Sequence, residues 1–358
     1  MSNRPETAPT IDWYTLLSLQ QARFDGQGRL LDFGDAAGEL HAVLGAGGVM
    51  PLPGVGVIRV VGQDAPAFLH AQLSHSVDDQ GTEQWRLAGY CNPKGRLLGL
   101  FQVVRLEADD FLLLTDASLI EPLVKRLRMF VLRARVALQD FTAHAGVWGA
   151  TGSGAAALTE LTGTLPQGVG AAMHAGDTTV LNLNADTERF LVIAHARDAA
   201  GLWRGLTAGS RPITPAAWTL LEVRAGVPSI TAGTSERFVP QQVNLDLIDG
   251  IDFRKGCYPG QEVVARMHYR GKASRRMFGL ATPGGQAPAP GDSVLTADGE
   301  TAGEIVQGVA GPTGVEALAV LRVEFRDRQD LRIAGQAARF MPLPYPVPPV
   351  AEDEAAGK

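Results

Sequence analysis

The sequence predicts an α+β protein in which two lobes combine antiparallel sheets with helices, followed by a small C-terminal β-barrel. Its 42 glycines and 22 prolines divide the 358 residues into many short periodic segments. Two hairpin patterns each lie next to a helical pattern, and after about residue 276 only strand-like runs remain. The length also favours two or three folding units, because one hydrophobic core seldom grows beyond about 250 to 300 residues.

The first lobe is expected over residues 51–145. A β-branched run over 55–61 predicts a strand, and the pattern after it predicts a helix with Phe68, Leu69 and Leu73 on one face. Runs 97–106 and 111–115 flank a polar turn and predict a hairpin. Ser118 is expected to cap the next helix, and a β-like run covers 134–141. Four apolar residues recur along that helix at helical spacing: Leu119, Leu123, Leu127 and Phe130.

The second lobe is expected over residues 146–275 and repeats this pattern. Helical periodicity covers 155–161 and 198–206, while 178–183 and 189–194 form a hairpin pattern. A further helix is bounded by Thr214, Pro215 and Gly226, each at a position that its residue type favours at a helix end. The β-barrel then spans 276–346. Residues 1–50 are expected to pack on the core as an extension, and 347–358 form a tail.

Composition and charge exclude several functional classes. The formal net charge is −6, which is opposite to that of a general nucleic-acid-binding protein. The chain holds neither a run of about 20 apolar residues nor a secretory signal, so we expect a cytoplasmic protein with no membrane partner. Two cysteines, Cys91 and Cys257, are too few for a disulfide framework or a four-thiolate zinc site, and no metal site is predicted.

One segment, residues 254–262, has a composition typical of a functional loop. Its glycines and proline predict tight turns, and a helix is expected to begin at Gln261 and Glu262. Cys257 follows Arg254 and Lys255, whose charges favour the thiolate together with the nearby helix start. Cys257 is therefore a candidate functional thiol, with Lys255 and Arg254 as its partners. The alternative interpretation is a small buried apolar residue.

The same segment resembles a known family. Residues 255–262 read KGCYPGQE and match all eight positions of K-G-C-[FY]-x-G-Q-E, a hallmark of the YgfZ family of folate-binding proteins, which are relatives of the glycine-cleavage T-protein. Residues 240–241, 244–245, 265–266, 270–271 and 342–345 agree as well, and the resemblance extends from about 52 to 345. It implies a T-protein-like, three-lobed architecture around a tetrahydrofolate pocket. It also implies a role in maturing or repairing iron-sulfur enzymes, notably radical enzymes that modify tRNA.

The resemblance implies folate contacts for a set of residues. Trp218 aligns with a tryptophan of the family, and an aromatic face suits a pterin or benzoyl ring, although a core anchor is the alternative. A second family tryptophan is replaced here by Val55. Cations in the run Arg266, Arg270, Lys272, Arg275 and Arg276 could bind the anionic glutamyl tail, a tRNA or a protein, or could simply be solvated. The implied folate-binding residues are Trp218, Asn244, Lys255, Gln261, Glu262 and Arg270.

Departures from the transferase define the alternatives. Gly99 and Leu100 stand where the T-protein has its two acidic residues, so amine transfer loses its main polar catalyst. Arg224 replaces a carboxylate expected near the pterin, and Glu222 lies on another helix face. The leading hypothesis is a folate-binding protein with iron-sulfur client or assembly partners and a weak tRNA contact. A tetrahydrofolate-dependent aminomethyltransferase or demethylase is the alternative, and an RNA-binding module is a third.

Overall fold

The computed structural model describes residues 9–184, 188–269 and 273–348. The chain forms two compact units, and each is built from separate stretches of sequence. The first unit comprises Met1–Ala65, Gln80–Trp85 and Gln102–Trp218. The second comprises Pro66–Asp79, Arg86–Phe101 and Thr219–Lys358. Within the described residues, no helix is long and apolar enough to cross a membrane.

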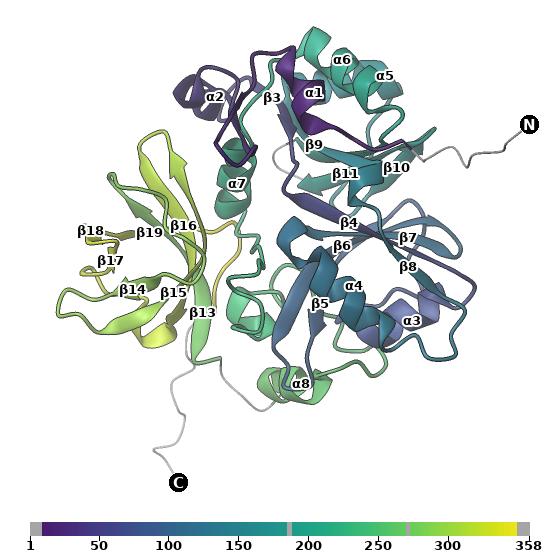
Figure 1. The fold of residues 1–358 in the computed structure, drawn as a ribbon. Helices are drawn as coiled ribbons and strands as arrows, with labels where there is room; N and C mark the ends of the chain where they lie inside the picture. The colour runs from purple at the N-terminus through teal and green to yellow at the C-terminus, as the bar shows by residue number, and fades with distance from the viewer. Residues whose placement is uncertain (1–8, 185–187, 270–272, 349–358) are drawn as a thin grey trace, which may run out of the picture. The chain divides into compact units, whose positions relative to one another are not determined.

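The first unit contains a five-stranded antiparallel sheet in the order β10-β11-β12-β9-β3. Helices α5 (Ser153–Thr162) and α6 (Ala199–Gly209) pack against it (Figure 1). Trp148, Phe190 and Trp203 lie in its core. The strands are β3 (Gly47–Pro51), β9 (Ala145–Gly152), β10 (Ala172–Ala175), β11 (Thr178–Asn184) and β12 (Arg189–His195). The N-terminal segment also provides α1 (Trp13–Ser18), β1 (Arg23–Phe24), β2 (Leu30–Asp32) and α2 (Ala36–Ala42).

A second five-stranded sheet has the order β5-β6-β7-β4-β8. Its strands are β4 (Val55–Val61), β5 (Trp85–Cys91), β6 (Leu97–Glu107), β7 (Asp110–Asp116) and β8 (Ala137–Asp140), which confirms the predicted strand and hairpin. The prediction for the next helix was wrong at both ends. Asp116, not Ser118, caps a 3-10 turn (Ala117–Leu119) ahead of α4 (Ile120–Arg128), and Phe130 lies beyond the helix instead of on its buried face.

The second unit joins three helices to an all-β lobe. The helices are α3 (Ala65–Gln72), the later part of α7 (Pro215–Arg224) and α8 (Gln261–Tyr269). The boundaries predicted for α7 are confirmed, because Thr214 Oγ1 accepts from Ala216 N at 3.2 Å and Gly226 follows with φ +65°. Short 3-10 turns complete the description at Pro240–Val243, Thr142–His144 and Val323–Phe325.

The all-β lobe is a curled seven-stranded sheet, half of a barrel, in the order β18-β17-β14-β15-β16-β13-β19 (Figure 1). All of its pairings are antiparallel, so the predicted all-β C-terminal lobe and the α+β class are confirmed. The strands are β13 (Arg275–Thr282), β14 (Ser293–Leu295), β15 (Thr301–Gly311), β16 (Gly314–Arg322), β17 (Arg332–Ile333), β18 (Gln336–Ala337) and β19 (Arg339–Met341).

Candidate functional site

The loop that carries Cys257 is fixed to the end of helix α3 by Lys255. The Lys255 ammonium donates to the carbonyl oxygen of Leu73 at 2.6 Å and to that of His70. It also lies 5.0 Å from the centre of the Tyr258 ring. The last carbonyls of a helix lack partners within it and carry partial negative charge, so a cation is favoured there. Lys255 therefore caps α3 and sets the position of the loop.

Burial changes the acid-base behaviour of this lysine. Desolvation lowers the pKa of Lys255 from 10.5 to about 8, and the negative charges of Asp252, Asp78 and Cys257 oppose that shift. Removing the ammonium from water therefore costs more free energy than the attraction of the neighbouring negative charges supplies. A substantial fraction of Lys255 is neutral at pH 8.

Cys257 itself is exposed, and so is Arg254, three residues before it. The next residue, Tyr258, is only 7% exposed, and burial raises the pKa of its hydroxyl. The loop therefore turns inward immediately after the thiol. Since Lys255 and Tyr258 anchor the loop on both sides, Cys257 is presented to solvent from a fixed support.

Two glycines bring this loop against the turn over residues 92–96. Gly260 has φ +80°, and a Cβ there would lie 2.4 Å from the carbonyl oxygen of Asn92 and 2.7 Å from the Cα of Gly95. Gly95 has φ +71°. Both positions require glycine, because a side chain would clash and the backbone is left-handed. The Asn92 Oδ1 atom accepts from Lys94 N at 2.9 Å and Arg96 N at 3.1 Å, which holds the facing turn.

The strand that leaves this turn is apolar where the transferase would need acids. Gly99 is buried and Leu100 is 8% exposed, both on β6. The Asn92 side chain is already engaged within its own turn. Across 92–100, no carboxylate is available to hold an amine or a folate nitrogen.

Helix α8 begins with two polar residues that face different ways. Gln261 Nε2 lies 3.5 Å from the Lys255 carbonyl oxygen, so this side chain turns back towards the loop. Glu262 instead pairs with Arg266 at 2.8 Å, one helical turn later, with side chains that are 85% and 71% exposed. An exposed pair of this kind contributes little to stability. Gln261 thus belongs to the thiol loop, whereas Glu262 lies on the solvent-facing side of the helix.

Asn244 and its neighbours form a buried polar layer. Asn244 has φ +60°, and its amide pairs with both backbone groups of Met277, at 2.8 and 3.3 Å. Gln241 Nε2 donates to the Val264 carbonyl at 2.7 Å, while its Oε1 is buried and has no hydrogen-bond partner among the described residues. Gln241 is therefore a buried acceptor that a ligand donor could satisfy.

The basic run after α8 is not one exposed face. Arg276 is 9% exposed and forms a bidentate pair with Asp246 at 2.6 and 2.9 Å, and it also donates to the Gln241 carbonyl. Arg276 is thus engaged inside the protein. Arg275 is exposed. Arg270, predicted to bind folate, and Lys272 lie outside the described residues.

Trp218 belongs to the first unit, whereas the other predicted residues belong to the second. Its ring lies against the backbone of Gly149 on β9, where a Cβ would come within 2.3 Å of Cε3. The Arg189 guanidinium carbon is 5.5 Å from the ring centre, within cation–π range. Trp218 is 4% exposed. The Trp218 indole is therefore a buried ring that packs on the β9 backbone and has Arg189 beside it.

Arg224 is accounted for by an ion pair. Its guanidinium makes a bidentate contact with Glu316 on β16, at 2.8 and 2.6 Å, and the Glu316 side chain is 9% exposed. The pair raises the pKa of Arg224. The charge of Arg224 is therefore neutralised by a carboxylate from the all-β lobe.

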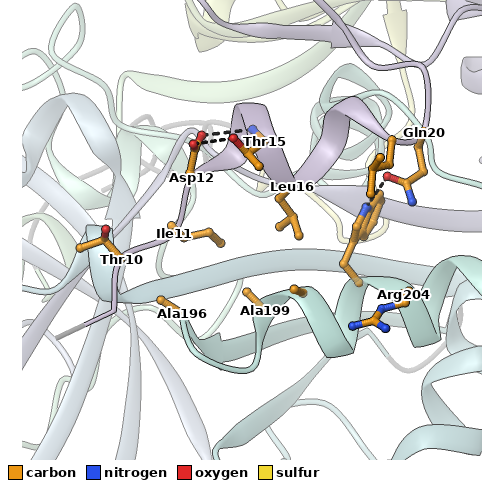
Figure 2. Close-up of a pocket in the computed structure, with 12 residues that line it drawn as sticks. Thr10, Ile11, Asp12, Thr15, Leu16, Gln20, Ala196, Ala199 and Arg204 are labelled. Atoms are coloured by element: carbon orange, nitrogen blue, oxygen red, sulfur yellow. Dashed lines mark hydrogen bonds between the residues drawn. The ribbon is translucent and has the colours of Figure 1, made fainter.

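The first unit also contains a pocket of about 520 Å³ between α1 and α6 (Figure 2). Ile11 and Leu16 face Ala196 and Ala199 across it, with Gln20 and Arg204 at one end. Trp203 Nε1 donates to Gln20 Oε1 at 3.0 Å. None of the residues that we predicted from the sequence lines this pocket.

Sequence reasoning missed the anchor of the thiol loop. His70 and Leu73 lie 185 and 182 residues before Lys255, and they contribute backbone carbonyls rather than side chains. A backbone acceptor leaves no residue-type signal. The apolar pattern places Leu73 on one face of a helix and predicts no helix end there, so it does not draw on the preference of a helix C-terminus for a cation.

Comparisons with known proteins identify relatives of this chain. No protein-family model matches the chain. A tRNA-modifying protein YgfZ from Cronobacter sakazakii is 31% identical over 243 residues, covering 67% of this chain and 73% of that protein. One from Yersinia enterocolitica is 28% identical over 298 residues, covering 81% and 89%.

Among solved structures, the glycine cleavage system aminomethyltransferase T from Bartonella henselae superposes with a TM-score of 0.75. It covers 94% of this chain and 98% of that one at 17% identity, so it confirms the T-protein-like fold and nothing further. The sequence matches carry the family assignment: this chain belongs to the family of the tRNA-modifying protein YgfZ.

Proposed function

We propose that this protein binds tetrahydrofolate in the cytoplasm and supports the maturation or repair of iron-sulfur enzymes, including radical enzymes that modify tRNA. Cys257 is its functional thiol. One observation carries the proposal: Cys257 is exposed while the residues around it, Lys255 and Tyr258, are anchored. A thiol held accessible on a fixed loop suits exchange with a partner thiol or transient contact with a cluster.

The folate part of the proposal rests on how residues of this chain match the chemistry of tetrahydrofolate. Gln241 Oε1 is a buried acceptor without a protein donor in the described segments. Trp218 is the aromatic residue that the resemblance implies for the folate ring. Tetrahydrofolate, when bound, supplies a reduced pterin that can carry a one-carbon unit. The position of Arg224 fits less well, because its guanidinium is engaged by Glu316 and cannot act as the missing carboxylate. We therefore expect pterin recognition that relies more on stacking than on a buried acid.

The apolar surroundings of Gly99 and Leu100 favour a binding role over amine transfer. A transferase needs a group that orients the amine or takes up a proton, and residues 92–100 supply none. The aminomethyltransferase or demethylase alternative would require that group to come from another segment. Incubation with tetrahydrofolate and an aminomethyl donor tests it directly. Turnover to methylene-tetrahydrofolate would overturn the binding role.

The thiol role is tested in cells that lack the native gene. We expect wild type to restore the nucleoside made by an iron-sulfur tRNA-modifying enzyme, and Cys257→Ser to fail while accumulating to the same level. Cys91→Ser is the matched control, since Cys91 is buried at the end of β5. Mass spectrometry of digested tRNA provides the measurement. Normal modification with Cys257→Ser would contradict the proposed thiol.

Folate binding is tested separately by calorimetric titration of the pure protein with tetrahydrofolate. We expect saturable binding that Trp218→Ala weakens by about two- to tenfold, because a stacked ring contributes about 0.5–1.5 kcal/mol beyond its buried area. Trp203→Phe, at another buried tryptophan of the same unit, should leave affinity unchanged. The absence of saturable binding to wild type would refute the ligand while leaving the thiol test intact.

A further inference from the structure

An exposed apolar group follows helix α4 in the first unit. Met129 is 58% exposed, Phe130 is 38% exposed and Leu132 is 87% exposed. We call these three residues the apolar knob. The inward face of α4 is already buried through Leu123 and Leu127, so the knob is not part of that helix packing. Three large apolar side chains are thus exposed within four consecutive residues, which differs from the single scattered exposure that is normal on a protein surface.

The knob is displayed on an ordered turn. Backbone bonds run from Met129 N to Arg126 O at 3.1 Å, from Phe130 N to Leu127 O at 3.0 Å and from Ala134 N to Val131 O at 2.7 Å. The Arg128 side chain donates to the Leu138 carbonyl of β8 at 2.7 Å. Leu132 has φ +46°, which a leucine rarely adopts. The fold thus holds a disfavoured conformation in which Leu132 is displayed to solvent.

Positive charge surrounds the knob. Residues 122–139, which lie between Glu121 and Asp140, contain five basic residues and no acidic one, although the chain as a whole carries −6. Arg135 pairs with Asp64 at 3.2 Å. Lys125 and Arg133 are exposed and form no ion pair among the described residues. The knob therefore lies in a locally positive field that an acidic partner would complement.

We propose that the apolar knob docks into an apolar pocket rimmed by Asp and Glu on a partner protein. Four of its five cations are arginines, and Phe, Met and Arg are the residue types enriched at protein interfaces. A protein surface that binds single-stranded nucleic acid presents several aromatic rings for stacking, whereas this patch has one. A membrane-surface helix would expose its apolar stripe, whereas that of α4 is buried.

The docking surface is independent of the thiol and of folate, and this separates its test from that of the proposed function. A photoreactive azidophenylalanine replaces Phe130 in the full chain, expressed in its own cells. The control places the same group at Tyr14, which is 64% exposed on α1. We expect a discrete protein adduct from position 130 alone, whose sequenced contact is an apolar segment flanked by acids. Adducts with RNA or lipid, or none above the Tyr14 level, would overturn the proposal.

The partner identified from the adduct is then purified, and its affinity for variants of this protein is measured. Leu132→Asn should weaken binding at least tenfold while stability is kept or raised, because asparagine tolerates positive φ. Phe130→Ser and the double variant Lys125→Glu with Arg133→Glu should each lose at least tenfold, and reversing the partner's acids should restore the charge variant. Cys257→Ser should bind normally. The docking surface would be refuted if these substitutions left the affinity unchanged, or if reversing the partner's acidic residues failed to restore binding of the Lys125→Glu, Arg133→Glu variant.

Discussion

Cys91 and Cys257 belong to the same compact unit and both neighbour Tyr258, yet the fold gives them opposite environments. Cys91 ends strand β5, is fully buried, and burial raises the pKa of its thiol to about 12. Cys257 lies in a loop that Gly260, with φ +80°, allows to turn sharply, and it is exposed. The same side chain thus fills space in one place and is presented in the other. Element type and anchoring, rather than the residue itself, set its chemistry.

The largest expected effect is the difference in thiol reactivity. With iodoacetamide at pH 8, we expect native protein to lose one thiol rapidly and the second only on unfolding. A pKa of about 12 leaves about one Cys91 thiol in 10⁴ ionised at that pH, before burial excludes the reagent. Cys257→Ser should abolish the fast phase and Cys91→Ser should keep it. Peptide mapping that finds Cys91 alkylated first would invert the comparison.

Removing Tyr258 should make the two thiols more alike. Tyr258→Ala deletes a buried ring beside Cys91, and we expect a loss of about 3–5 kcal/mol in the free energy of unfolding. Cys91 should then react measurably in the native state. Tyr258→Phe keeps the ring and should leave Cys91 protected. Urea titration and timed alkylation measure both quantities, and unchanged protection of Cys91 in Tyr258→Ala would show that another layer shields it.

The glycines of the loop provide a matched pair. Gly260→Ala should destabilise by about 2 kcal/mol or more, since its φ is positive and a Cβ would meet Asn92 O at 2.4 Å. Gly256→Ala should change stability by about 0.5 kcal/mol or less, because the nearest atom to its Cβ is His70 Nε2 at 3.5 Å. Equal effects in urea titrations would mean that the two turns do not interlock as described.

The smallest effect concerns pH. The pKa of Lys255 is lowered in the folded state, so between about pH 8 and 10 the unfolded chain binds more protons and stability should rise with pH. The slope for one proton is at most about 1.4 kcal/mol per pH unit, reduced here because the group is partly solvated. Lys255→Met should lose this rise. Comparing the urea-derived free energies of the two proteins at pH 7, 8, 9 and 10 cancels other titrations, and parallel curves would contradict the assignment.

Much of the fold could be predicted because local patterns determined it. The β-branched run of β4, the hairpin of β6 and β7, and the limits of α7 depend on neighbouring residues, and all are confirmed. The start of α4 was wrong because Ser and Asp compete for the same capping role, and Asp116 took it. Phe130 was misplaced because helical spacing continues past Arg128 in the sequence while the backbone turns.

The site was predicted in part for the same reason. A motif of eight residues identifies Cys257 and Gly260, but nothing near residue 255 indicates that its ammonium binds carbonyls at the end of α3. Nor does composition reveal that Arg276 and Arg224 are engaged by Asp246 and Glu316. Long-range pairs of this kind depend on topology, which residue types alone do not encode.

The bond from Lys255 to His70 has a consequence for synthesis. Its two partners are separated by 185 residues, so the loop cannot be anchored until that length of chain has followed α3 out of the ribosome. At typical translation rates of about 5–20 residues per second, this interval is about 10–40 s. During this interval helix α3 lacks its cap, and Cys257 has not yet been synthesised. Cys257 and Lys255, which anchors its loop, are therefore synthesised almost together, late in translation.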